Sequence, residues 1–305
     1  MRPLRCPLPR GLYELCTRIT GNALLARPSE EVNAMILGVI GRAQLHAEIK
    51  LHAFIFLSNH YHILVSIPNG PELSKFMQFV NGNIAKELNL INERDGALWE
   101  RRFRSIPVAQ DSCTQVWRLR YLLAHGTKEN LVGRIGDWPG ASSLKWLRDG
   151  KPIIGRWLDR TARYHARRRK GYVEQPDEFA IYYELKMTVL PCWRDLPAAA
   201  WRSLVRNIIG ELQAEANERI EATGLRPLGV AAVLAADPYS RVRSKHGRAP
   251  TVLSRDRGVG REMVVQLRAL AELWREAADA AMALMTGGNA ASLPLPSTMW
   301  LGLRV

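Results

Sequence analysis

Hydrophobic and polar positions in the first third of the chain change period several times. Short apolar or alternating runs rich in strand-forming residues give way to segments with hydrophobes at helical spacing, and then return. The predicted order is strand (11–19), helix (29 to about 46), strand (49–57), strand (61–67), helix (72–92) and strand (98–108). This order is typical of a ferredoxin-like antiparallel sheet, so we predict an α+β fold of the βαββαβ type.

The pattern beyond this unit is mainly helical. Residues 111–125 predict one more helix of the first part, and 201–221 and 259–285 predict long helices of the second, with a short helical element within 224–235. We therefore expect two domains, one over 1–150 that contains this sheet and a basic, mainly helical domain over 151–305, which resembles no family that we can name.

The net charge of the chain indicates what kind of partner it binds. The 305 residues contain 43 Lys and Arg against 29 Asp and Glu, a formal net charge of +14, which favours a polyanion such as nucleic acid. No apolar run has the length of a membrane span, and residues 1–10 lack the apolar core of a signal peptide. We expect a cytoplasmic protein that does not act at a membrane.

Two histidines stand out at the start of the predicted strand 61–67. His60 and His62 flank Tyr61, and side chains two apart in a strand share one face. Two imidazoles side by side suit a metal ion. The simpler interpretation is a pair of histidines on a half-exposed strand, hydrogen-bonded to water and backbone.

Basic residues form two further groups. Arg101, Arg102 and Arg104 follow Trp99 near the predicted fourth strand, and cations mixed with aromatic rings suit single-stranded nucleic acid. A denser run at 163–170 includes Arg167, Arg168, Arg169 and Lys170, which we interpret as a linker or arm that follows phosphates. In both groups the alternative is an ordinary solvated surface.

Five sequence blocks, in order, resemble those of a known family. They are Asn59-His60-Tyr61-His62 after an apolar strand, a long helix, the segment from Gly96 to Phe103, Arg120-Tyr121-Leu122-Leu123, and the segment from Asp137 to Ser143. Over residues 8–148 the chain is similar to the single-tyrosine HUH transposases, and specifically to the REP-associated tyrosine transposases and their insertion-sequence relatives.

The resemblance implies a chemistry. In that family the histidine pair holds a divalent metal, usually magnesium or manganese, that polarises a phosphate of single-stranded or hairpin DNA. A tyrosine attacks this phosphate, which leaves a phosphotyrosine link and a free 3'-hydroxyl, usually within a homodimer. Imidazole suits manganese better than magnesium, which prefers oxygen ligands.

The resemblance also raises a question about the nucleophile. Counting back from Gly96 places the family's tyrosine near Ile84, in the helix 72–92, which contains no tyrosine. Tyr121 in the next helix is the candidate we name instead. On the helix 72–92, Asn83 and Glu87 are four residues apart and are candidates for further metal ligands.

Two interpretations of function therefore remain open at this stage. The protein is a transposase-like enzyme that cleaves and transfers strands of single-stranded or hairpin DNA in a metal-dependent way, through a tyrosine from elsewhere or through water. Alternatively, it is a domesticated, non-catalytic nucleic-acid-binding protein or regulator.

Overall fold

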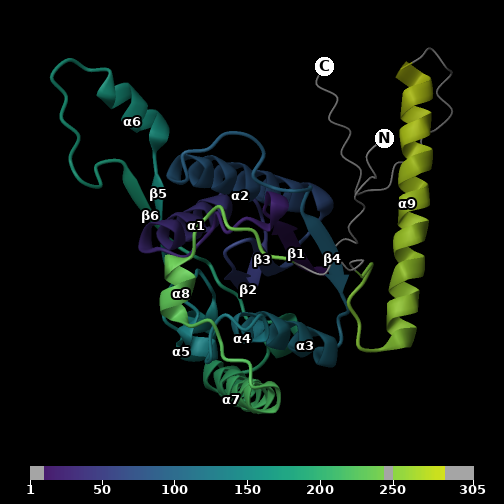
Figure 1. Cartoon of the computed structure of the whole chain (residues 1–305). Coiled ribbons are helices and arrows are strands. Elements are labelled where there is room, and N and C mark those ends of the chain that lie inside the picture. The colour runs from purple at the N-terminus through teal and green to yellow at the C-terminus, as the bar shows by residue number, and fades with distance from the viewer. Residues whose placement is uncertain (1–9, 244–249, 286–305) are drawn as a thin grey trace.

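A four-stranded antiparallel sheet forms the centre of the protein in the computed structural model, which describes residues 10–243 and 250–285 (Figure 1). Its strands are β1 (Leu12–Arg18), β2 (Lys50–Phe56), β3 (His60–Ser66) and β4 (Arg104–Val108). They lie in the order β2-β3-β1-β4, with antiparallel neighbours throughout. Helices α1 (Glu30–Ala43) and α2 (Gly70–Ile91) follow β1 and β3. The predicted ferredoxin-like α+β fold is confirmed.

Helices α1 and α2 cover one face of this sheet (Figure 1). Each begins at a polar side chain that accepts a hydrogen bond from a backbone amide of the first turn, Ser29 for α1 and Asn69 for α2. From β3, Tyr61, Ile63 and Val65 are buried in the core that these helices share. The remaining residues of β3, including His60 and His62, consequently face the other side of the sheet.

The other face is covered by α3 (Ser112–Leu123), α4 (His125–Lys128) and α7 (Ala198–Thr223), which lie on the side of the sheet opposite α1 and α2 (Figure 1). Leu64 of β3 and Ile55 of β2 are buried there in one cluster with Leu119 and Val205. The C-terminal part of the chain thus contributes to the core on this face.

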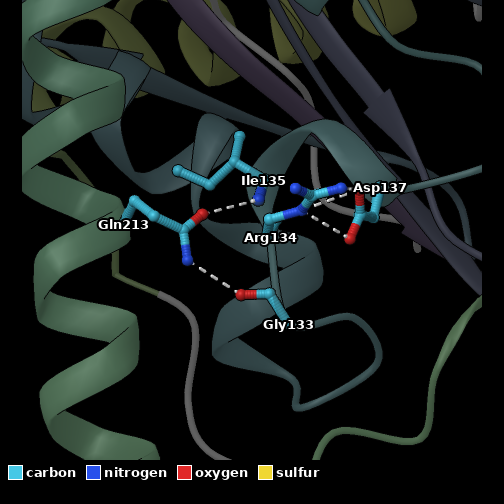
Figure 2. Close-up of polar contacts among 5 residues, drawn as sticks. All are labelled: Gly133, Arg134, Ile135, Asp137 and Gln213. Carbon is cyan, nitrogen blue, oxygen red and sulfur yellow. Dashed lines mark hydrogen bonds and ion pairs between the residues drawn. The ribbon is translucent and has the colours of Figure 1, made fainter.

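A side chain of α7 fixes the loop that precedes α5 (Leu144–Asp149) (Figure 2). The amide of Gln213 donates to the carbonyl of Gly133 at 2.9 Å and accepts from the backbone N–H of Ile135 at 3.2 Å. In the same loop, Arg134 pairs with Asp137. This loop leads into the last of the five sequence blocks, so the C-terminal half supports it directly.

A hairpin arm extends from the α1 side of the molecule (Figure 1). It consists of β5 (Ile154–Leu158), α6 (Arg160–Arg167) and β6 (Ala180–Glu184). Its base packs tightly on α1, because a Cβ added to Gly155 would lie 2.0 Å from the backbone nitrogen of Gly38. The basic run 163–170 therefore belongs to a strand-helix-strand arm rather than to a simple linker.

The remaining elements are short, apart from one long helix. They are the 3-10 helices Thr20–Asn22, Ile135–Asp137 and Pro191–Trp193, with α5 (Leu144–Asp149), α8 (Val230–Ala235) and α9 (Arg257–Met285). The predicted strand 98–108 begins only at Arg104; before it, Trp99 forms a single bridge with Ile19. Within the described residues, no helix combines the length and apolar character needed to span a membrane.

Candidate active site

Two imidazoles share one surface of β3, as the alternation of the strand predicted. The ring centroids of His60 and His62 are 5.4 Å apart, and both rings face α3 and α4. Tyr61, between them, is buried on the opposite face. Helix α2 packs on the face that holds Tyr61, so the two histidines lie on the face of the sheet away from α2.

A third histidine, which sequence reasoning missed, completes the cluster. His125 begins α4, and its Nε2 lies 2.8 Å from Nε2 of His60. One ring nitrogen from each of the three histidines lies within 4.8 Å of the others. The signal for His125 was its position four residues after Tyr121 on a helical segment, which places both on one side.

Hydrogen bonds orient two of these rings. His60 Nδ1 lies 2.6 Å from the side-chain oxygen of Asn59, and His62 Nδ1 lies 2.7 Å from a carboxylate oxygen of Glu14. Because both partners are acceptors, Nδ1 of each ring carries the proton and Nε2 keeps its lone pair. Carboxylates and amides that hold histidine ligands in this way are a regular feature of metal sites.

Burial disfavours the charged form of two of these histidines, His60 and His125. Burial lowers the pKa of His60 to about 3, assisted by the charges of His62 and Arg18. It also lowers the pKa of His125 well below its usual value, and His62 and His60 act in the same direction. Ring nitrogens of three imidazoles that lie within 4.8 Å of one another fit a divalent transition-metal ion such as manganese better than magnesium.

Tyr121 of α3 lies beside this cluster. Its ring centroid is 5.4 Å from that of His62 and 4.9 Å from that of His125. Two cations contact the ring: the guanidinium carbon of Arg118 is 4.1 Å from its centroid and Nζ of Lys128 is 4.5 Å from it. Burial, with Glu14 nearby, raises the pKa of Tyr121 to about 12, so the phenol holds its proton at neutral pH.

A buried carboxylate connects the metal-ligand candidates to the surroundings of Tyr121. Glu14 is 2% exposed and accepts hydrogen bonds from His62 and from Nε of Arg118, the latter at 2.6 Å. Burial alone would raise the pKa of Glu14, but the hydrogen bond from His62 and the charges of His62 and Arg118 together lower it. Glu14 is another residue that the sequence did not single out.

The second helix does not reach the histidines. Glu87 forms an ion pair with Arg160 at the base of the hairpin arm, and the amide of Asn83 donates to the carbonyl of Phe79 within α2. Ile84, where we expected the family's tyrosine, is buried in the core between α2 and the sheet. The helix that brings a tyrosine to the histidines is therefore α3 and not α2.

The two basic groups lie in different places. Arg101, Arg102 and Arg104 line a cavity of about 1120 Å³, together with His60, His62 and Tyr121. The other group is on the hairpin arm, which packs on α1 and therefore on the other face of the sheet. There Arg167 pairs with Glu174, and Arg168 contacts the ring of Tyr164. The structure does not bring Arg167, Arg168, Arg169 and Lys170 to the cavity.

Comparisons with known proteins found similar sequences and structures. Residues 27–121 match the family model described as "Transposase IS200 like". Among solved structures, a REP-associated tyrosine transposase bound to a REP hairpin is similar at 16% identity, over 47% of this chain and 82% of that chain, with a TM-score of 0.38. A putative transposase from Deinococcus radiodurans R1 is 14% identical, over 39% of this chain and 95% of that chain, with a TM-score of 0.28. No curated protein matches significantly. The resemblance to single-tyrosine transposases is thereby confirmed, and over residues 27–121 the match is to the IS200-like transposase family.

Proposed function

We propose that this protein is a DNA transposase that cleaves and transfers single-stranded DNA, with Tyr121 as the nucleophile. The observation that carries the proposal is the contact of Tyr121 with the cluster of three histidines, His60, His62 and His125. Metal-dependent phosphoryl transfer to a protein side chain requires a nucleophile and residues that hold a metal ion. The phenol of Tyr121 and the three histidines would supply both in one pocket.

The chain's own groups have defined tasks in this reaction. Oη of Tyr121 attacks the phosphorus of the scissile phosphate and gives up its proton to water. The bond to the 3'-oxygen breaks, and the leaving oxygen takes up a proton from water to give a free 3'-hydroxyl. Arg118 and Lys128 lie against the ring and favour the negative charge that develops on the phenol oxygen. The phosphotyrosine bond retains the energy of the phosphodiester, so a second hydroxyl can later rejoin the strand.

His60, His62 and His125 are the residues that would hold a divalent cation. When bound, the cation would neutralise the charge on the non-bridging oxygens of the phosphate. Glu14 and Asn59 keep His62 and His60 oriented. We propose manganese rather than magnesium, because imidazole nitrogens are poor partners for magnesium.

The DNA would be bound as a single strand, in part folded as a hairpin, as the sequence blocks indicate for this class of transposase. Arg101, Arg102 and Arg104 beside the cavity are suited to its phosphates. The exposed Arg168, Arg169 and Lys170 of the hairpin arm would contact DNA away from the cavity. We propose a cytoplasmic location, where a protein that acts on such DNA would find its substrate. Pairing of two copies remains a prediction that a mass measurement in solution tests.

The alternative of a protein that binds DNA without cutting it was motivated by the lack of a tyrosine in residues 72–92. Tyr121 lies beside the histidines, so a candidate nucleophile is present and we favour the enzyme over this alternative. The test is incubation of the full chain with an end-labelled hairpin oligonucleotide and Mn²⁺, followed by denaturing electrophoresis. Cleavage that EDTA abolishes supports the transposase. Intact DNA that is nevertheless shifted in a native gel would favour the non-catalytic alternative.

A further inference from the structure

The cavity beside His60 has walls of opposite chemical character, and one of them comes from the C-terminal half. Leu228, Val233, Val242 and Leu253 line it together with the catalytic candidates, and we call these four residues the apolar wall. We propose that the apolar wall contacts the bases of the single-stranded DNA while arginines of the same cavity hold its phosphates. This inference rests on the proposed function and gives the C-terminal half a role in recognising the substrate.

The apolar wall is built into the nuclease fold and is not a detached tail. Three backbone hydrogen bonds fasten its segments: Leu228 N to Asn130 O at 3.0 Å, Leu24 N to Ser240 O at 3.2 Å, and Leu253 N to Pro107 O at 2.8 Å. The last of these continues the sheet, because Leu253 bridges Val108 at the edge of β4 in parallel orientation. The wall is thus held from the α4 side, from the segment after the 3-10 helix Thr20–Asn22 and from β4.

Two members of the wall are unusually exposed for large apolar side chains. Leu228 is 55% and Val242 is 47% exposed, whereas Val233 and Leu253 are buried. Both exposed side chains border the cavity, so a flat apolar surface placed there would cover them. The face of an unpaired base is such a surface, while in a duplex the bases are stacked and paired and cannot present it.

The charged residues that line the cavity indicate that its ligand is negatively charged. Arg101, Arg104 and Arg243 line it and are exposed, and none of the acidic residues that the structure describes forms an ion pair with them. Uncompensated arginines facing an open cavity are complementary to phosphates. Pockets for drug-sized ligands span roughly 300–1,000 Å³, so a cavity of about 1120 Å³ has room for more than one nucleotide.

The experiment compares two strands that differ only in their bases. Equilibrium binding to the full chain, without divalent metal so that no cleavage occurs, is measured for a fluorescent 12-nucleotide DNA strand and for an abasic deoxyribose-phosphate strand of equal length. The double variant Leu228→Ser/Val242→Ser removes the exposed part of the wall. Leu225→Ser is the matched control, because Leu225 is 62% exposed and does not line the cavity.

We expect the wild type and Leu225→Ser to bind the normal strand about tenfold more tightly than the abasic strand, and the double variant to lose this preference. Arg101→Gln/Arg104→Gln should instead weaken both strands and reduce the salt slope by roughly 1.4, for two lost phosphate contacts. A double variant that keeps the wild-type preference would overturn the inference and leave the proposed function standing. Tighter binding of RNA of the same sequence would overturn DNA as the occupant. A wild-type protein that binds no single strand at all would instead overturn the proposed function.

Discussion

The carboxylate of Glu14 lies 2.7 Å from Nδ1 of His62 and also pairs with Arg118, so one buried acid on β1 touches both a metal-ligand candidate and the cation beneath Tyr121. The register of the sheet creates this relationship. Cys16 of β1 pairs with His62 of β3, which places Glu14 two residues further along the same face. An acid in this position sets the tautomer of His62 and leaves Nε2 free to bind metal.

The first prediction concerns Glu14→Gln. The amide still offers an oxygen to His62 but removes the negative charge that strengthens the imidazole as a ligand. We expect the Mn²⁺ affinity to fall by about 10–100-fold, measured by titration calorimetry. Glu218→Gln on the exposed side of α7 is the control and should bind Mn²⁺ as the wild type does. Unchanged affinity in a folded Glu14→Gln protein would mean that Glu14 has only a structural role.

The second prediction concerns His125, the ligand candidate on α4. His125→Ala leaves two imidazoles, and we expect Mn²⁺ affinity to fall by more than the roughly 10–100-fold that loss of an outer partner causes. His165→Ala, at an exposed position of α6, should bind Mn²⁺ normally. If His125→Ala bound the ion as tightly as the wild type, the contact between His60 and His125 would be a hydrogen bond alone.

The strand alternation was sufficient to place His60 and His62 on one face, and the order of elements was sufficient to predict the sheet. The partners of these histidines were not predictable in the same way. His125 and Glu14 lie 65 and 48 residues from the histidines that they contact, and contacts of that kind depend on how α4 and β1 pack against β3.

The expectation of the family's tyrosine near Ile84 has a related cause. Helices α2 and α3 both follow a strand and both carry hydrophobes at helical spacing, so sequence pattern alone does not say which covers the histidine face. Packing decides it, since Ile84 of α2 is buried against the face of Tyr61 and α3 brings Tyr121 to the opposite face. The hairpin arm was missed because its strands are short and partly exposed.

The third prediction uses the close contact of the arm with α1. Gly155→Ala would place a methyl group 2.0 Å from the nitrogen of Gly38, so the backbone of the arm must move. We expect a loss of about 1–3 kcal/mol in the free energy of unfolding, measured in urea. Gly82→Ala in α2 is the matched control. Nothing lies within 4 Å of the added methyl there, and alanine should stabilise the helix by up to about 1 kcal/mol.

The fourth prediction concerns pH and His52. Burial lowers the pKa of His52 to about 4, although hydrogen bonds to Thr188 and Val189 oppose this shift. Below pH 6.5, His52 binds a proton in the unfolded chain, whereas in the folded chain it binds one only near pH 4. Stability from this group is therefore complete above pH 6.5 and declines as the pH falls toward 4, by up to about 1.4 kcal/mol per pH unit.

Urea unfolding at pH 7.5 and pH 5 measures this effect, with His52→Gln as the comparison. The other histidines contribute equally to both proteins, so the difference isolates His52. We expect the wild type to lose more stability than His52→Gln between the two pH values. Equal losses would show that His52 does not remain neutral in the folded protein.

The most direct measurement of the central claim is the identity of the residue that becomes linked to DNA. The protein is incubated with a hairpin oligonucleotide and Mn²⁺, digested, and the DNA-linked peptide is sequenced by mass spectrometry. We predict a phosphotyrosine link at Tyr121, absent from Tyr121→Phe and retained in Tyr164→Phe, whose ring is on the hairpin arm. A link at another tyrosine, or cleavage of equal rate by Tyr121→Phe, would contradict the assignment of Tyr121 as the nucleophile.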